Sequence, residues 1–279
     1  MKKILTLLIL PLVASCLFAE GFNFEKKLEL AKKGDAEAQN EIGEYFADGG
    51  QGKFPPDYMS AVQWWDAASK NGSARALTNI GTLWYAGKGV PANRHKAVQI
   101  WIEAAKLGDS EAQYLLGQAY SGGLGVLPDE PTAAFWWEKA SEQNHAKAQC
   151  NLAFAYANGR GVSKRDIKKA FELWKASAEQ GNTVSQTYLG LCYFTGDGVA
   201  PDLKKAIAIW TNASEFNNRE ARRYLGIAYS TGKGVKKDVK KAMQLFKLAA
   251  EQGDKDAATY YEQLRIDNAS SVQKQKQKK

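Results

Sequence analysis

Residues 220–253 read EARRYLGIAYSTGKGVKKDVKKAMQLFKLAAEQG, and most of the chain between residues 36 and 261 repeats their pattern. Six copies align on one column of small residues: Gly43, Gly81, Gly117, Ala153, Gly190 and Gly226. The copies are 36 to 38 residues apart. A repeat period in this range is typical of a stacked array of short units and not of a single globular core.

The first half of each unit predicts an amphipathic helix. In residues 220–253, Ala221 is followed four positions later by Leu225 and eight positions later by Tyr229. This spacing puts the three side chains on one face of an α-helix. The glycine of the repeat column lies within that helix, where it costs roughly 1 kcal/mol relative to alanine. We therefore expect another backbone to pass close to this glycine.

The second half predicts another helix, which a fixed turn joins to the first. Ala242, Phe246 and Ala249 have the spacing of one helical face, and the other five copies have tryptophan in place of Phe246. A Gly-x-Gly-Val turn precedes this helix in five copies, and only glycine or asparagine follows its end. Both residue types readily adopt left-handed backbone conformations. Each unit is therefore predicted to be an antiparallel helical hairpin.

These columns resemble Sel1-like repeats, which are related to the tetratricopeptide repeat. The resemblance covers residues 36–261 and rests on the Ala-x-x-x-Leu-Gly-x-x-Tyr half, the Gly-x-Gly-Val turn and the Ala-x-x-x-Trp half. It implies an all-α fold, a right-handed α-solenoid of about six hairpins plus terminal caps. It also implies a non-enzymatic adaptor or scaffold that binds a protein or peptide partner through the concave face of the solenoid.

The pattern divides the chain into successive segments. We expect a signal peptide at 1–19, an N-terminal capping segment at 20–35, the solenoid at 36–265 and a basic disordered tail at 266–279. Residues 255–265 repeat the first-helix pattern and are expected to cap the array, because a terminal unit must present a polar outer face. The repeats are expected near 36–72, 73–108, 109–145, 146–182, 183–218 and 219–254.

The N-terminus has the plan of a secretory signal peptide. Lys2 and Lys3 precede an apolar run that is short for a membrane span, and small residues follow it. Cleavage after Ala19 would give a periplasmic or secreted protein. The alternative is a bacterial lipobox ending in Cys16, which would give a lipoprotein anchored through a lipid on that cysteine.

Two cysteines, Cys150 and Cys192, remain after the predicted signal. They are offset by about 7 Å along the helix axes at helical rise, whereas a disulfide requires closely approaching Cβ atoms. We therefore do not expect a bridge between them. Some secreted Sel1-like proteins are rich in cysteine and hold each hairpin with a disulfide, a pattern that this sequence lacks.

The sequence offers little chemistry. His95 and His145 have no accompanying cluster of metal-ligating residues, so no metal site and no cofactor are expected. Ser230 and Lys233 match the Ser-x-x-Lys motif of penicillin-recognising enzymes, but they occupy a turn that recurs in the other copies. We expect no enzymatic activity. The alternative is a cell-wall or β-lactam hydrolase of the cysteine-rich secreted Sel1-like type.

The predicted partner-binding face lies on the first helices, opposite their buried stripe. It becomes apolar from the fourth copy onward, which is typical of an interaction site, although tight curvature of the array could instead bury these side chains. The predicted contact residues are Tyr85, Tyr114, Gln118, Phe154, Leu191, Phe194, Arg223 and Ile227.

The formal net charge of +8 falls to +6 once Lys2 and Lys3 are removed. Four further lysines lie in the tail at 266–279, which we interpret as a solvated solubility tag. We expect a protein or peptide partner, no nucleic acid, and membrane contact only if Cys16 is lipidated.

Overall fold

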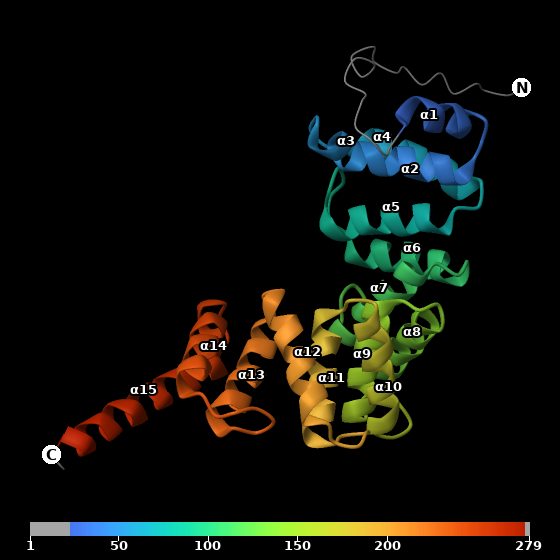
Figure 1. The fold of residues 1–279 in the computed structure, drawn as a ribbon. Helices are drawn as coiled ribbons and strands as arrows, with labels where there is room; N and C mark the ends of the chain where they lie inside the picture. The colour runs from blue at the N-terminus through green and yellow to red at the C-terminus, as the bar shows by residue number, and fades with distance from the viewer. Residues whose placement is uncertain (1–22, 277–279) are drawn as a thin grey trace, which may run out of the picture. The chain divides into compact units, whose positions relative to one another are not determined.

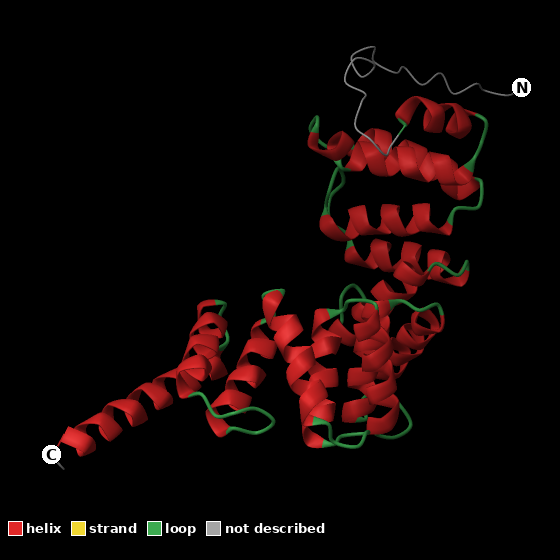
Figure 2. Ribbon diagram, viewed as in Figure 1, coloured by secondary structure: helices red, strands yellow, loops and turns green. Residues whose placement is uncertain are grey.

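The computed structural model describes residues 23–276, and every regular element in this range is an α-helix (Figures 1 and 2). This confirms the all-α prediction. Most of the fifteen helices of the described range pair as repeat hairpins. The predicted signal peptide, with Cys16, and residues 277–279 lie outside the described residues. The chain divides into two compact units, Met1–Ala112 and Gln113–Lys279, whose boundary falls within α7 (Ser110–Gly122).

The first unit contains two repeat hairpins and an N-terminal helix. Helices α2 and α4 form the first hairpin, α5 and α6 form the second, and α1 packs against α2. The short element α3 lies in the connection of the first hairpin, where Gly50 and Gln51 have left-handed φ values of 62° and 63°. The bounds are α1 Phe24–Lys32, α2 Ala36–Ala47, α3 Gly49–Gly52, α4 Tyr58–Lys70, α5 Ala74–Ala86 and α6 Arg94–Lys106.

The second unit continues the array. Helix α8 packs against α9, the hairpins α9/α10, α11/α12 and α13/α14 follow, and α15 packs on α14 (Figure 1). The bounds are α8 Glu130–Glu142, α9 Ala146–Asn158, α10 Ile167–Glu179, α11 Thr183–Thr195, α12 Leu203–Glu215, α13 Arg219–Thr231, α14 Val239–Glu251 and α15 Lys255–Lys276.

The helix ends follow the predicted turn chemistry. The first glycine of the Gly-x-Gly-Val turn closes the preceding helix in a left-handed conformation, as at Gly232 with φ 82°. An aspartate then caps the next helix, because the Asp238 carboxylate accepts a hydrogen bond from the backbone N–H of Lys241 at 3.0 Å. Asn144 and Asn217, both with φ 60°, confirm the predicted left-handed position after each second helix.

The repeat glycine makes room for a side chain, so the expectation that a backbone passes close to it is wrong at most copies. A Cβ on Gly81 would lie 2.6 Å from Cδ1 of the buried Trp101 ring, on the second helix of the same hairpin. The Trp101 Nε1–H donates a hydrogen bond to the Thr78 carbonyl at 3.2 Å. The glycine therefore lets the Nε1 edge of a large indole approach the first helix closely.

The N-terminal segment forms the predicted capping helix within its described residues. Asn23 caps α1, and the buried Phe24 ring lies 4.8 Å from that of Tyr45. The Gln39 side chain donates a hydrogen bond to the Ala31 carbonyl at 2.9 Å. Helix α1 thus covers the first hairpin and closes this end of its hydrophobic cluster.

The prediction that ordered structure ends at Arg265 is wrong. Helix α15 runs through Lys276, so most of the predicted tail is helical (Figure 1). No glycine or proline interrupts residues 255–276, and alanine, glutamine and lysine are good helix formers. A segment rich in lysine and glutamine is polar, yet its helix propensity is high enough to continue the helix.

Both remaining cysteines are buried free thiols, so the expectation of no bridge is confirmed. Burial raises the pKa of the Cys192 thiol to about 12, with a further increase from the charge of Asp197. Burial also raises the pKa of Cys150, against the lowering effect of a hydrogen bond with Ser185. The folded chain therefore keeps both sulfurs in the protonated form at neutral pH.

Replacing Gly81 with alanine tests the close packing of the tryptophan. The change gains roughly 1 kcal/mol of helix propensity, but overpacking of a core costs about 1–3 kcal/mol. We expect a lower free energy of unfolding by about 1 kcal/mol in urea titration. Ala153→Gly is the reciprocal control and should cost more than the propensity term of about 1 kcal/mol, because it also removes a buried methyl group. A clearly stabilised Gly81→Ala protein would contradict the packing constraint.

The raised pKa values predict slow thiol chemistry in the folded protein. In a Cys16→Ser background, Cys150 and Cys192 should react with a chromogenic disulfide reagent far more slowly at about pH 8 than in urea. A free thiol has a pKa near 8.5, so the unfolded chain supplies thiolate at that pH. Equal rates in the folded and unfolded protein would contradict the burial of both sulfurs.

Candidate functional site

The predicted contact residues divide between the two units. Tyr85 belongs to the first unit, and the other seven predicted residues belong to the second. The half-buried Tyr85 ring lies 5.4 Å from the Trp101 ring, and the Arg94 guanidinium lies 5.4 Å from the centre of the same tyrosine ring. Tyr85 therefore packs locally against its own hairpin.

Tyr114 and Gln118 on α7 are the first of the predicted contact residues in the second unit, and both have polar groups. The Gln118 side-chain amide donates a hydrogen bond to the Tyr114 hydroxyl at 2.9 Å. Its carbonyl oxygen accepts one from Asn151 of the next first helix at 3.3 Å. The Tyr114 ring also stacks on His145, with 4.8 Å between ring centres. Both predicted residues thus connect successive repeats, and Gln118 remains exposed.

Phe154 on α9 packs against two aromatic rings. It meets Trp174 of its own hairpin edge to face at 5.3 Å and Tyr188 of the next hairpin at 4.6 Å. Tyr188 in turn stacks on Trp174 at 5.2 Å. Phe154 is half-buried by these contacts. Contacts with its own and the neighbouring hairpin therefore cover much of the Phe154 ring. This agrees with the alternative in which packing against the next repeat buries these side chains.

Leu191, Phe194 and Ile227 are also half-buried. Leu191 and Phe194 on α11 pack against the cluster around Trp210, with 5.2 Å between the Phe194 and Trp210 rings. Ile227 on α13 packs against the cluster that contains Phe246. Each of these side chains packs on the core with one side and is exposed to solvent on the other. We call Phe154, Leu191, Phe194 and Ile227 the apolar row.

The sequence interpretation missed a set of tyrosines that close the junctions between hairpins. Tyr224 stacks on Trp210 of the preceding hairpin at 5.2 Å and 15°, and Tyr260 stacks on Phe246 at 5.3 Å. Tyr188 does the same on Trp174. The signal was available, because these tyrosines stand two positions before the repeat-glycine column in the later copies, where the earlier ones have Glu41, Asn79, Leu115 and Asn151.

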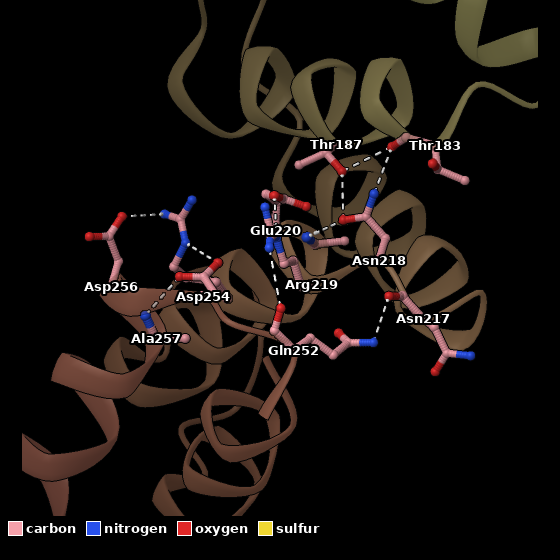
Figure 3. Close-up of polar contacts among 12 residues, drawn as sticks. Thr183, Thr187, Asn217, Asn218, Arg219, Glu220, Gln252, Asp254, Asp256 and Ala257 are labelled. Atoms are coloured by element: carbon pink, nitrogen blue, oxygen red, sulfur yellow. Dashed lines mark hydrogen bonds and ion pairs between the residues drawn. The ribbon is translucent and has the colours of Figure 1, made fainter. Parts of the chain in front are cut away.

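A charged cluster, formed by Arg223, Asp254 and Asp256, lies at the junction of α13 with α15. The Arg223 guanidinium pairs with Asp254 at 2.9 Å and lies 3.8 Å from Asp256. Its side chain is 16% exposed and that of Asp254 is 7% exposed. Asp254 also caps α15 by accepting a hydrogen bond from the Ala257 N–H at 2.9 Å (Figure 3). Burial opposes the charge on Arg223, but the hydrogen bond and the charge of Asp254 raise its pKa.

Polar contacts continue this cluster across the neighbouring junctions (Figure 3). The Asn218 side-chain oxygen accepts a hydrogen bond from the Thr187 hydroxyl at 3.1 Å, and the Gln252 side-chain amide donates one to the Asn217 backbone carbonyl at 3.1 Å. A shallow polar recess of about 210 Å³ opens here. Its lining consists of Arg219, Glu220, Arg223, Gly253, Asp254, Lys255 and Asp256. This recess could receive a charged group of a partner.

The Ser-x-x-Lys motif does not form a catalytic arrangement. The Ser230 hydroxyl donates a hydrogen bond to the Ile227 carbonyl at 2.9 Å. The Lys233 ammonium lies 4.1 Å from the centre of the Phe194 ring, so an aromatic face and not the serine is its neighbour. A nucleophilic serine needs a base within hydrogen-bond reach. The motif is therefore a turn.

Two further properties of the described residues bear on the site. No group of three or more histidine, cysteine or acidic side chains in residues 23–276 is placed to hold a metal ion. None of the helices in that part of the chain is both long and apolar enough to cross a bilayer.

The repeat pattern matches the Sel1 repeat family model at 36–73, 74–109, 110–145, 146–182, 183–215 and 219–254. The chain belongs to the Sel1 repeat family. No curated protein matches this chain. The family assignment confirms the resemblance seen in the sequence and the six repeats of the helical solenoid.

Two solved structures show the same architecture. One is a protective antigen of uropathogenic Escherichia coli strains, with 31% identity and a TM-score of 0.74 over 86% of this chain. The match covers 51% of the antigen, so this chain spans about half of its length. The other is a Sel1 repeat protein from Oxalobacter formigenes, with 27% identity and a TM-score of 0.69, which covers 82% of this chain and 100% of that one.

Removing one carboxylate from the charged cluster should destabilise the fold, because it leaves a mostly buried cation unpaired. Asp254→Asn keeps a capping side chain, as Asn218 shows in the preceding repeat, but leaves the Arg223 cation without its closest anion. We expect the free energy of unfolding in urea to fall by about 1–3 kcal/mol.

Asp109→Asn is the matched control for that change. Asp109 caps α7 and accepts a hydrogen bond from the neutral Thr78 hydroxyl at 2.7 Å, so it has no buried cation to leave unpaired. We expect a loss below about 0.5 kcal/mol, since asparagine caps about as well as aspartate. Equal losses in the two variants would show that the Arg223 ion pair contributes nothing.

Proposed function

We propose that this protein is a non-enzymatic adaptor or scaffold of the cell envelope or secreted space. It binds a protein or peptide through the apolar row on α9, α11 and α13. The observation that carries the proposal is the half-burial of Phe154, Leu191, Phe194 and Ile227. Each packs on the core through one side and leaves an apolar part available to a partner.

The packing of the row favours its use in recognition. Phe154 and Phe194 are held by contacts with Trp174 and Trp210, so their rotamers are largely fixed before a partner arrives. Prior ordering lowers the entropic cost of binding, which for a free side chain is about 0.5–1.5 kcal/mol. Aromatic anchors in such settings often dominate the energetics of protein interfaces.

The charged cluster adds a means of selecting and orienting the partner. The recess beside Arg223 contains both cationic and acidic side chains, and Ile227 of the apolar row follows Arg223 by one turn of α13. Charge complementarity at the edge of an interface fixes register and speeds association more than it adds affinity. An extended segment with apolar side chains and a charged group at one end would fit this arrangement.

The N-terminal sequence supports the proposed envelope or secreted location. The sequence begins with two lysines, an apolar run and small residues, the plan of a signal peptide. Lipid attachment at Cys16 is the alternative form of the same export proposal. Either form would place the repeat array outside the cytoplasm, where an adaptor can join other envelope proteins.

Leu191→Glu tests the apolar row. A partner is first captured by cross-linking from an envelope extract, then purified and titrated against the wild-type chain and the variant. We expect the dissociation constant to rise at least about tenfold, because a charge is placed within an apolar contact. Circular dichroism and urea midpoints identify any loss of folding.

Leu248→Glu is the matched control. Leu248 is 43% exposed on α14, so the same charge is introduced on a second helix and outside the row. Its affinity for the partner should equal that of the wild type. If the two folded variants bind alike, the apolar row is not the contact surface.

A further inference from the structure

The connections within the hairpins form one edge of the second unit. The α9–α10, α11–α12 and α13–α14 connections lie at the same end of their hairpins (Figure 1). Close packing links them: a Cβ on Gly198 would lie 2.6 Å from the Ile167 carbonyl oxygen, and one on Gly234 would lie 3.0 Å from Cβ of Leu203. Each connection therefore rests on the start of the preceding second helix. We call residues 159–169, 196–205 and 232–241 the turn edge.

The turn edge accounts for the net positive charge of the molecule. It has twelve lysines and arginines and four aspartates, a formal net charge of +8. The whole chain also has a net charge of +8, so the remaining residues are neutral in sum. The cations are Arg160, Lys164, Arg165, Lys168, Lys169, Lys204, Lys205, Lys233, Lys236, Lys237, Lys240 and Lys241. Such concentration on one edge produces a strong local potential.

The aspartates of the turn edge already accept hydrogen bonds within the chain. Asp166, Asp202 and Asp238 accept hydrogen bonds from backbone N–H groups at the starts of their helices. Asp197 accepts one from the Thr195 hydroxyl at 2.8 Å. Of the twelve cations, only Lys169 and Lys205 make ion pairs with described residues. Most of the cationic side chains of the turn edge therefore have no anionic partner among the described residues.

Aromatic rings hold a lysine at the same position in each of the three hairpins. The ammonium groups of Lys169, Lys205 and Lys241 lie 4.2, 5.2 and 4.3 Å from the centres of tyrosine rings on the preceding first helices. Cation–π contact restrains these side chains. The result is a regular row of ammonium groups, one for each repeat.

An exposed leucine lies at the end of this row. Leu127, in the α7–α8 connection, is 86% exposed and is the most exposed large apolar side chain among those described. The connection leads into Glu130, whose carbonyl oxygen lies against Gly161 of the turn edge. Asp129 and Glu130 are acidic neighbours of this leucine, but the Asp129 carboxylate caps α8. An exposed apolar residue thus stands next to the cationic row.

We propose that the turn edge docks on an anionic lipid surface. Ten of its twelve cations are lysines, which act as point charges and suit a mobile array of headgroups better than a fixed bidentate partner. Leu127 would enter the headgroup region, and the combination of basic residues with an apolar one is typical of proteins that lie on a membrane. An acidic polypeptide would give no role to Leu127. This mode requires no lipid on Cys16, in contrast to the expectation from the sequence.

Vesicle co-sedimentation of the Cys16→Ser full chain tests the proposal. The vesicles contain phosphatidylcholine alone or with about a third phosphatidylglycerol. We expect binding only to the anionic vesicles at about 50 mM salt and a loss of most of it at about 500 mM, because salt screens exposed charges. The variant Lys164→Gln, Lys168→Gln, Lys236→Gln and Lys240→Gln should bind at least about tenfold more weakly.

The matched control removes the same number of charges elsewhere. Lys32→Gln, Lys106→Gln, Lys175→Gln and Lys247→Gln are exposed positions outside the turn edge, and this variant should retain most of the wild-type binding. Leu127→Ser should weaken binding to the anionic vesicles by a smaller factor that persists as salt is raised.

Three outcomes would overturn the proposal. The first is no wild-type binding to anionic vesicles at low salt, and the second is equal weakening by the two quadruple variants. The third is binding to soluble polyglutamate, lost in the turn-edge variant, without binding to vesicles. That third result would assign the turn edge to an acidic polypeptide instead of a membrane.

Discussion

The structure depends on the contact between the aromatic side chain of each second helix and the small residue of the first helix in the same hairpin. Trp101 lies over Gly81 and Phe246 over Gly226, where a Cβ would meet the ring at under 3 Å. One such contact fixes the separation and register of two helices. Because each hairpin buries its aromatic ring partly with help from the next one, neither the hairpins nor their junctions can be stable in isolation.

The same rings also build the candidate site. Trp174 and Trp210 receive Tyr188 and Tyr224 from the following hairpins, and the apolar row packs on what remains of their surfaces. Packing on Trp174 and Trp210 therefore limits how much of Phe154 and Phe194 is exposed to a partner. A partner would add to a surface that is already ordered, so the row offers moderate area but little entropic cost.

The sequence predicted the elements well because each of their determinants is local. Asn144 and Asn217 marked helix ends by their conformational preference, and the Gly-x-Gly-Val turn marked the connections. The neighbour of the repeat glycine, the stacking of Tyr224 on Trp210 and the pairing of Arg223 with Asp254 join residues 14 to 31 positions apart. Those contacts depend on how hairpins are placed, which column patterns alone do not give. Helix α15 differs, because its lysine- and glutamine-rich end is polar in composition but has a high helix propensity.

The two proposed surfaces occupy different parts of the hairpin, and this separation has a physical origin. The apolar row lies along the first helices, where its side chains also pack on the core of the array. The turn edge lies at the helix ends, where side chains point into solvent and charge can accumulate without disturbing the packing. Lys233 connects the two, since it extends from the turn edge to the Phe194 ring. A chain held to a lipid surface by the turn edge would thus leave most of the apolar row free to hold a second protein there.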